Sequence, residues 1–122
     1  MVRKRRLRIY VAGAYDTVDQ VKLFQNISRG LRASTELILA GFSPFCSWID
    51  ILYKILLKEG ETLSRAELFE YVTAWLPVSD AVLVLPESED SVGTKEEMRL
   101  ARELGIPVFY TMEDLLAWAK TQ

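Results

Sequence analysis

Histidine is absent from this sequence, and cysteine occurs once, as Cys46. A chain without histidine cannot form a Ser-His-Asp triad or a Cys-His pair. A single cysteine cannot form an internal disulfide, and it leaves the usual zinc sites without their ligands. We therefore expect no metal and no cofactor, and we expect any chemistry to depend on carboxylates, hydroxyls or backbone groups.

Long apolar runs are also missing. No stretch of about 18 apolar residues could form a membrane span, and the basic start is not followed by the hydrophobic segment of a signal peptide. These absences predict a cytoplasmic protein with no membrane partner. With 122 residues, half of them apolar, the sequence fits one compact domain spanning residues 1–122.

Basic residues are scarce beyond the first eight positions. The formal net charge is −2, but five of the fifteen bases lie in residues 3–8, so residues 9–122 carry ten bases against seventeen acids. Nucleic-acid-binding faces are basic, so we expect no nucleic-acid partner for the folded body. We interpret residues 1–6 as a solvated, flexible lead-in to the first strand, with a phosphate-seeking arm as the alternative.

Apolar segments of strand and helix character alternate along the chain. The expected strands cover residues 7–13, 42–46, 81–85 and 107–110. The expected helices cover residues 18–40, 51–58, about 65–76, 95–104 and 113–120. This alternation predicts a single-domain α/β fold of the Rossmann-like (flavodoxin-like) type, with a parallel sheet ordered about 2-1-3-4 and helices on both faces.

Two of these helices carry clear local signals. Ser64 and Glu67 have the spacing of a capping box at the start of the third helix. The first helix has apolar residues spaced three, four and seven apart, which predicts the face that it buries. That face contains Phe24, Ile27, Leu31 and Ile38.

In this strand order the first and third strands are neighbours, and their crossovers leave in opposite directions. A crevice then opens at their carboxyl ends, so the loop after Gly13 should face the loop before Gly93. The second loop leads into a helix, whose N-terminus can bind an anion. Its spacing matches neither a P-loop nor a dinucleotide fingerprint. The candidate binding residues are Gly13, Ala14, Tyr15, Asp16, Ser91, Gly93 and Thr94.

Helical phase separates two adjacent glutamates in the fourth helix. At about 100° per residue, Glu97 shares the apolar, sheet-facing side with Ala101 and Leu104, whereas Glu96 faces solvent. Glu97 is therefore the candidate catalytic carboxylate. The alternative is that Thr94 and Glu97 form a capping box, T-K-E-E.

The other candidates in these loops also have structural explanations. Ser91 and Thr94 are either ligand hydroxyls or turn and cap residues. Tyr15 and Asp16 could form a simple turn, although the end of a central strand favours a binding role.

Several longer stretches suggest a family. These are I-Y-V-A-G-A-Y at residues 9–15, N-I-S-R-G-L-R-A leading to A-G-F-S-P, and S-D-A-V-L-V-L-P followed by D-S-V-G-T-K-E-E-M-R-L-A. The chain resembles the nucleoside 2-deoxyribosyltransferase-like superfamily, which includes small deoxynucleoside 5′-monophosphate N-glycosidases and uncharacterised, often phage-borne domains. The resemblance covers most of the chain except about residues 47–70.

The resemblance implies a chemistry for the crevice. Glu97 looks like the family nucleophile, which attacks C1′ of the sugar, expels the base and leaves a glycosyl ester for water or a second base. Ser91 falls where monophosphate-using members bind the 5′-phosphate, so a nucleotide or nucleoside is the implied small-molecule partner. Gly13, Ala14 and Tyr15 match the loop that approaches the substrate. Family members often complete their sites across a dimer, which implies a homo-oligomer.

One departure leaves the function open. Family enzymes carry an aspartate on the helix before the third strand, where this sequence has Val72. Glu70 faces another side of that helix, and nothing in the sequence places Asp50. The missing acid keeps a non-catalytic nucleotide-binding module as the alternative to an enzyme.

A purely structural or assembly role is the third hypothesis. Trp48, Tyr53 and Trp75, together with residues 51–57, are either core residues or a subunit interface.

Overall fold

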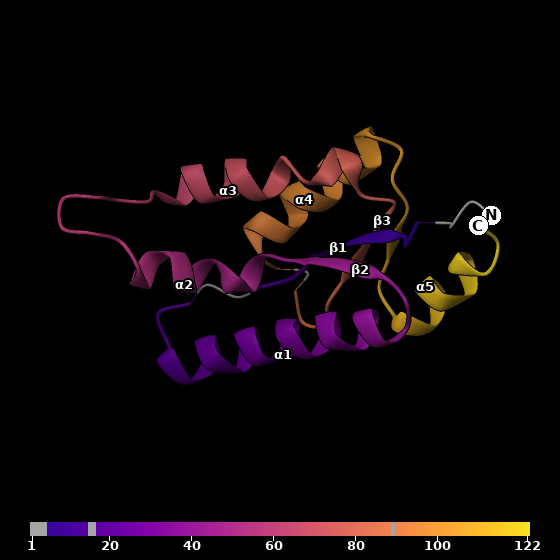
Figure 1. Ribbon diagram of the computed structural model, residues 1–122, viewed down its shortest axis with the longest axis horizontal. Coiled ribbons are helices and arrows are strands. Elements are labelled where there is room, and N and C mark those ends of the chain that lie inside the picture. The colour runs from indigo at the N-terminus through magenta and orange to yellow at the C-terminus, as the bar shows by residue number, and fades with distance from the viewer. Residues whose placement is uncertain (1–4, 15–16, 89) are drawn as a thin grey trace.

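Four parallel strands form the central sheet of this protein (Figure 1). The computed structural model describes residues 5–14, 17–88 and 90–122. The strands are β1 (Arg8–Ala12), β2 (Ser43–Cys46), β3 (Ala81–Val84) and β4 (Val108–Phe109). Their order is β2-β1-β3-β4, so the predicted α/β fold and strand order are confirmed.

The two central strands are apolar on both faces. Residues 9–12 of β1 and all four residues of β3 are buried, as a parallel strand covered by helices on each side requires. Ile9 pairs with Ala81 on one side and with Pro44 on the other. Pro44 is tolerated because β2 is an edge strand, where one row of backbone groups needs no partner.

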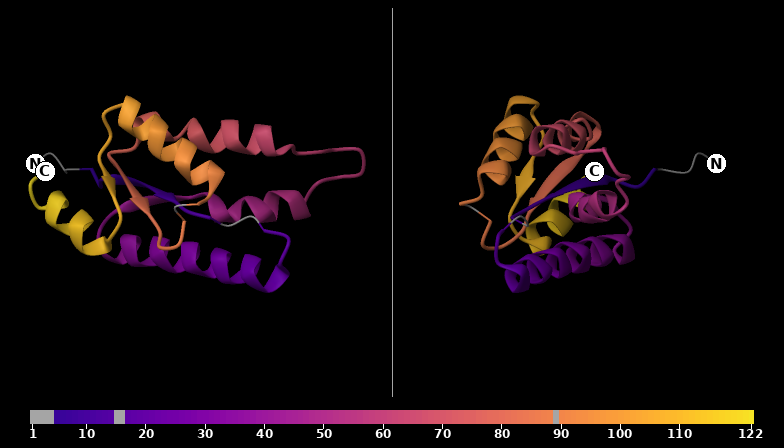
Figure 2. Two further views of the ribbon diagram at one scale, coloured as in Figure 1. Left: turned by 180° about the vertical axis from the view of Figure 1, so that it is seen from behind. Right: turned by 90° about the vertical axis from the view of Figure 1, so that its left-hand side faces the viewer.

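Helices cover both faces of the sheet (Figures 1 and 2). They are α1 (Gln20–Leu39), α2 (Asp50–Ile55), α3 (Arg65–Thr73), α4 (Val92–Glu103) and α5 (Met112–Ala119). Helices α1 and α5 lie on one face, and α3 and α4 lie on the other. Short 3-10 turns, η1 (Ser47–Ile49) and η2 (Leu76–Val78), connect strands and helices. No helix in the described part of the chain is long and apolar enough to cross a membrane.

The predicted buried face of α1 is wrong. Phe24, Leu31 and Ile38 are 63%, 43% and 50% exposed, and of the expected four only Ile27 packs against the core. The residues that α1 buries are mostly small or polar: Asn26, Gly30, Ser34 and Leu37.

The indole of Trp48 explains this choice of face. Trp48 is fully buried beneath α1, and a Cβ atom added to Gly30 would lie 2.3 Å from its ring. Only glycine allows the ring to approach the helix this closely. The buried Ser34 hydroxyl donates a hydrogen bond to the Gly30 carbonyl oxygen at 2.9 Å. Close packing of a large ring against small residues therefore outweighs the apolar periodicity of the helix.

The second sheet face packs against α4 and η2. Its buried cluster includes Tyr10, Leu76, Val82, Met98 and Ala101. This face holds the candidate functional residues described below.

The aromatic residues considered for an interface separate into two groups. Trp48 belongs to the core, whereas Tyr53 and Trp75 are about half exposed. An assembly role would therefore involve Tyr53 and Trp75 but not Trp48.

The basic start of the chain contacts the folded body. Arg5 pairs with Asp80 at 2.7 Å, and Arg6 donates to the Phe42 carbonyl at 2.9 Å. The Arg8 amide also donates to the Asp80 carboxylate at 2.7 Å. Arg5 and Arg6, which we expected to belong to a flexible lead-in, thus make defined contacts.

Candidate active site

The loops after β1 and β3 meet at the carboxyl edge of the sheet. The Ala14 amide donates a hydrogen bond to the Ser88 hydroxyl at 3.0 Å. A Cβ atom on Gly13 would lie 3.0 Å from both Ser88 Oγ and the Trp48 ring, so glycine permits this close approach. The predicted convergence of the two loops is confirmed. Tyr15 and Asp16 lie outside the described residues.

Ser88 was not among the predicted site residues. Its side chain is buried and joins the two loops. The sequence signal for it was weak, because a serine four residues after a strand is common in any turn.

Helix α4 begins three residues earlier than predicted. Ser91 is its N-cap, and its hydroxyl accepts a hydrogen bond from the Thr94 amide at 3.3 Å. Thr94 therefore lies inside the first turn, fully buried, and its Oγ1 atom has no hydrogen-bond partner in the described part of the chain. The alternative of a capping box between Thr94 and Glu97 is wrong, because Glu97 lies beyond the capping positions.

Glu97 faces the interior, as its helical phase predicts. It is 8% exposed, whereas Glu96 forms an ion pair with Arg99 on the surface. A Cβ atom on Gly93 would lie 4.0 Å from Glu97 Oε1, so the carboxyl group lies alongside the first turn of α4. Burial raises the pKa of Glu97 to about 7.

Tyr10 of β1 is a polar neighbour of Glu97. Its hydroxyl group opposes the rise in the pKa of Glu97. The pKa of Tyr10 is itself raised, first by burial and then by the charges of Glu97 and Asp50. Its oxygen is buried and makes no hydrogen bond of good geometry with any described residue. Tyr10 is thus a neutral donor that a ligand could engage.

The sequence predicts a strand at Tyr10 but no functional role for its side chain. The available signal was its hydroxyl group, which is unusual in the middle of an otherwise apolar central strand.

Asp50 brings a second carboxyl group to the same region. It is the first residue of α2, it is 3% exposed, and its Oδ1 atom has no hydrogen-bond partner among the described residues. Burial raises the pKa of Asp50, while hydrogen bonding from Tyr71 and the charge of Lys54 lower it. By contrast, Val72 is buried and apolar.

An aromatic layer supports these polar groups. The Phe45 ring lies 5.5 Å from Tyr10, 6.2 Å from Tyr71 and 5.7 Å from Trp75, measured between ring centroids. The Tyr53 ring lies 6.1 Å from that of Tyr71. The hydroxyl and carboxyl groups therefore lie beside a largely apolar wall, which strengthens their electrostatic interactions.

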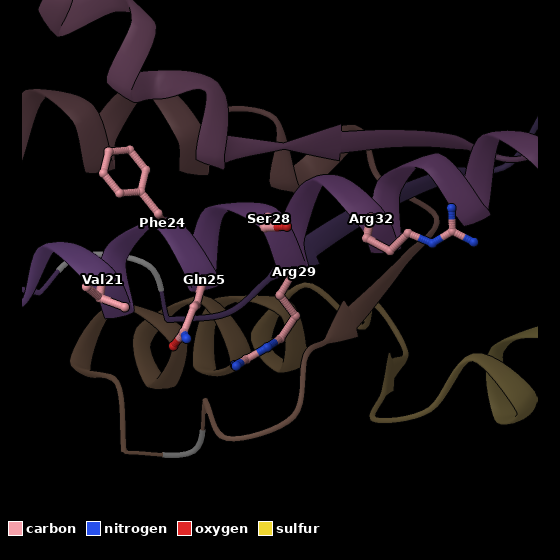
Figure 3. Close-up of a pocket in the computed structure, with 6 residues that line it drawn as sticks. All are labelled: Val21, Phe24, Gln25, Ser28, Arg29 and Arg32. Carbon is pink, nitrogen blue, oxygen red and sulfur yellow. The ribbon is translucent and has the colours of Figure 1, made fainter.

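A separate hollow of about 650 Å³ lies on the outer surface of α1 (Figure 3). Its lining residues all come from that one helix: Val21, Phe24, Gln25, Ser28, Arg29 and Arg32. It contains none of the predicted site residues. Across residues 5–14, 17–88 and 90–122, no cluster of three or more acidic or cysteine side chains could hold a metal ion.

Comparison with known families gives the chain its classification. The family described as "Domain of unknown function (DUF4406)" matches residues 7–110. The chain belongs to the DUF4406 family. The matched residues include Tyr10, Asp50, Thr94 and Glu97, so these four buried polar residues lie within the family domain. No curated protein matches the sequence.

A solved structure with a similar fold is a 2-deoxyribosyltransferase from Bacillus psychrosaccharolyticus. The two structures share a TM-score of 0.57 at 18% sequence identity, over 83% of this chain and 69% of the other. At this identity the likeness shows that the DUF4406 chain has the fold of the 2-deoxyribosyltransferase.

Proposed function

We propose that this protein is an enzyme that cleaves, or transfers at, the N-glycosidic bond of a (deoxy)nucleoside 5′-monophosphate. The observation that carries this proposal is the Glu97 carboxyl group, which is buried next to the Tyr10 hydroxyl and has a pKa raised to about 7. A structural glutamate gains nothing from such a position, whereas a nucleophile does. The fold shared with a 2-deoxyribosyltransferase supports the same class of reaction.

In the proposed reaction the ionised Glu97 carboxylate attacks C1′ of the sugar. The bond from C1′ to the base breaks, its electron pair stays on the base nitrogen, and a glycosyl ester forms on Glu97. Water, or a second base, then attacks C1′ and releases the carboxylate. With a pKa of about 7, Glu97 is ionised in a substantial fraction of molecules near neutral pH.

The remaining predicted residues form the proposed binding site. Ser91 and Gly93 lie at the N-terminus of α4, which can attract the 5′-phosphate. Thr94 adds a buried hydroxyl oxygen that no described residue satisfies, and such an atom gains stability from a ligand partner. The proposed site also includes Gly13 and Ala14, which meet the loop after β3, and Tyr15 and Asp16 on the ground of the sequence alone.

Base release tests the proposal directly. Purified protein is incubated with a panel of nucleoside and deoxynucleoside 5′-monophosphates, and free base is followed by chromatography. We expect release from at least one nucleotide and a loss of about a thousandfold or more in Glu97→Gln. Glu96→Gln is the matched control, because Glu96 is adjacent in sequence but paired on the surface. The proposal is wrong if the wild type releases no base from any nucleotide, or if Glu97→Gln releases base as fast as the wild type.

A non-catalytic nucleotide-binding module is the second candidate. Val72 supports it, because the corresponding residue in the superfamily that the chain resembles is an aspartate. This candidate predicts that nucleotides raise the melting temperature without turnover. If no nucleotide shifts the melting temperature at millimolar concentration, the binding role fails as well.

A further inference from the structure

The carboxyl group of Asp50 has no structural reason for its position. It is 3% exposed, and its Oδ1 atom has no hydrogen-bond partner among the described residues. A buried, incompletely satisfied carboxyl group destabilises a fold unless a ligand or a reaction uses it. Nothing about starting a short helix requires this burial, since exposed aspartates favour helix starts equally well.

Asp50 neighbours Tyr10 and Tyr71, whose rings both contact the Phe45 ring at centroid distances of 5.5 and 6.2 Å. The charges of Asp50 and Glu97 both act on the Tyr10 hydroxyl. Tyr10 is therefore within reach of two carboxyl groups, which come from α2 and α4. Interactions of this kind act over a few ångströms in a partly buried site.

Tyr71 of α3 holds Asp50 in this place. Its hydroxyl group interacts with the Asp50 carboxyl group by hydrogen bonding, and its ring packs edge-on against Phe45 and Tyr53. Such a partner fixes the orientation of an acid without occupying both of its oxygens. The buried Oδ1 atom keeps no hydrogen-bond partner among the described residues.

We infer that Asp50 is the second catalytic carboxyl group of this site, which protonates the leaving base and then activates the attacking water. This inference rests on the function proposed above. It assigns the role of the superfamily aspartate, which this chain lacks, to a residue from another helix. Asp50 lies in the segment, about residues 47–70, that the resemblance to the superfamily does not cover.

As Glu97 attacks C1′, the electron pair of the breaking bond goes to the base nitrogen, and the Asp50 carboxylic acid gives its proton to the base. The Asp50 carboxylate then takes a proton from water while the water oxygen bonds to C1′ and the ester bond to Glu97 breaks. One water is consumed, one base and one sugar phosphate are released, and both carboxyl groups return to their starting states. Burial favours the protonated form of Asp50 that the first step needs.

Leaving-group dependence tests this role. The first substrate is the nucleotide that the wild-type protein cleaves fastest, and the second is 4-nitrophenyl 2-deoxyribofuranoside 5-phosphate, whose leaving group needs no proton. For Asp50→Asn we expect a loss of about 10²- to 10⁴-fold in kcat on the nucleotide and less than about tenfold on the nitrophenyl substrate. Glu97→Gln should lose both activities. Glu70→Gln, which changes an exposed carboxylate on α3, should lose neither.

The melting temperature of Asp50→Asn and the activity of Tyr71→Phe separate a loss of catalysis from a loss of folding. We expect Asp50→Asn to melt no lower than the wild type, because the change removes a buried carboxyl group whose ionisation burial opposes. If that variant does not fold, Tyr71→Phe serves instead and should show the same substrate dependence at smaller size. Equal losses on the two substrates, or an Asp50→Asn variant with full activity on the nucleotide, would overturn the inference. Wild-type protein that releases no base refutes the proposed function itself, whereas wild-type turnover with an unaffected Asp50→Asn variant refutes only the role of Asp50.

Discussion

Two helix starts in this protein look alike in sequence and differ in structure. Residues 64–67 read S-R-A-E and residues 94–97 read T-K-E-E, and both fit a capping box. At α3 the box forms: the Ser64 hydroxyl accepts from the Glu67 amide at 3.0 Å, and the Glu67 carboxylate interacts with Ser64 in return. At α4 the cap is Ser91, and Glu97 is buried beside Tyr10.

The difference shows what position in the fold adds to a local pattern. Helix α3 begins in solvent, so its exposed glutamate can serve its own backbone. Helix α4 follows the carboxyl end of a central strand, so a side chain in its second turn is buried beside Tyr10. The same residue type stabilises one helix start, and at the other it bears a cost of burial that the proposed function would explain.

The largest expected contrast is in stability. Because the pKa of Glu97 rises from 4.5 to about 7 on folding, the folded state binds its proton more tightly than the unfolded state. The associated stability is fully present below about pH 4.5 and is lost as the pH rises through 7. Glu97→Gln should therefore be more stable than the wild type by about 3 kcal/mol at pH 8 and equally stable at pH 4.

Glu67→Gln is the matched control for this contrast. Glutamine can also complete a capping box, so this variant should stay within about 0.5 kcal/mol of the wild type. Urea unfolding at the two pH values measures both variants. A Glu97→Gln variant that is less stable than the wild type at pH 8 would show that Glu97 supports the fold.

The second contrast concerns activity and pH. Glu97 must be ionised to attack, so kcat/KM on the nitrophenyl substrate, which needs no proton from Asp50, should fall about tenfold between pH 8 and pH 6. Tyr10 lowers the pKa of Glu97, so Tyr10→Phe should move this decline to higher pH. Glu67→Gln should leave the profile unchanged. Ionisation of the substrate affects all three proteins equally. Superimposable pH profiles for the wild type and Tyr10→Phe would contradict the proposed interaction between Tyr10 and Glu97.

The smallest contrast separates the two cap residues. Ser64→Ala and Ser91→Ala each remove one cap, and each should cost about 1 kcal/mol in thermal or urea unfolding. Only Ser91→Ala should also raise KM for a nucleoside 5′-monophosphate, because Ser91 is proposed to bind its phosphate. An unchanged KM would show that Ser91 caps α4 but does not bind the phosphate.

Much of this architecture follows from the sequence. Alternating apolar segments gave the strand order, and helical phase separated Glu97 from Glu96. The convergence of Ala14 with the loop after β3 followed from the crossover directions. These features depend on periodicity and topology, which a single sequence displays.

The remaining features depend on packing between distant segments. The buried face of α1 is set by Trp48, which lies eighteen residues beyond Gly30 in sequence. Asp50 of α2 interacts electrostatically with Tyr10 of β1 and Tyr71 of α3, and no local pattern in the sequence shows this. The true start of α4 was missed because Ser91 and Thr94 are both good cap residues, and the fold selects the earlier one.

The stereochemistry of the product tests the central claim that Glu97 attacks C1′ covalently. Wild-type protein cleaves its best nucleotide in water containing methanol, and proton NMR identifies the anomer of the methyl 2-deoxyribofuranoside 5-phosphate that forms. Two displacements through a Glu97 ester predict the β-anomer, the configuration of the starting nucleotide. Formation of the α-anomer would mean a single displacement by solvent and would contradict a covalent role for Glu97.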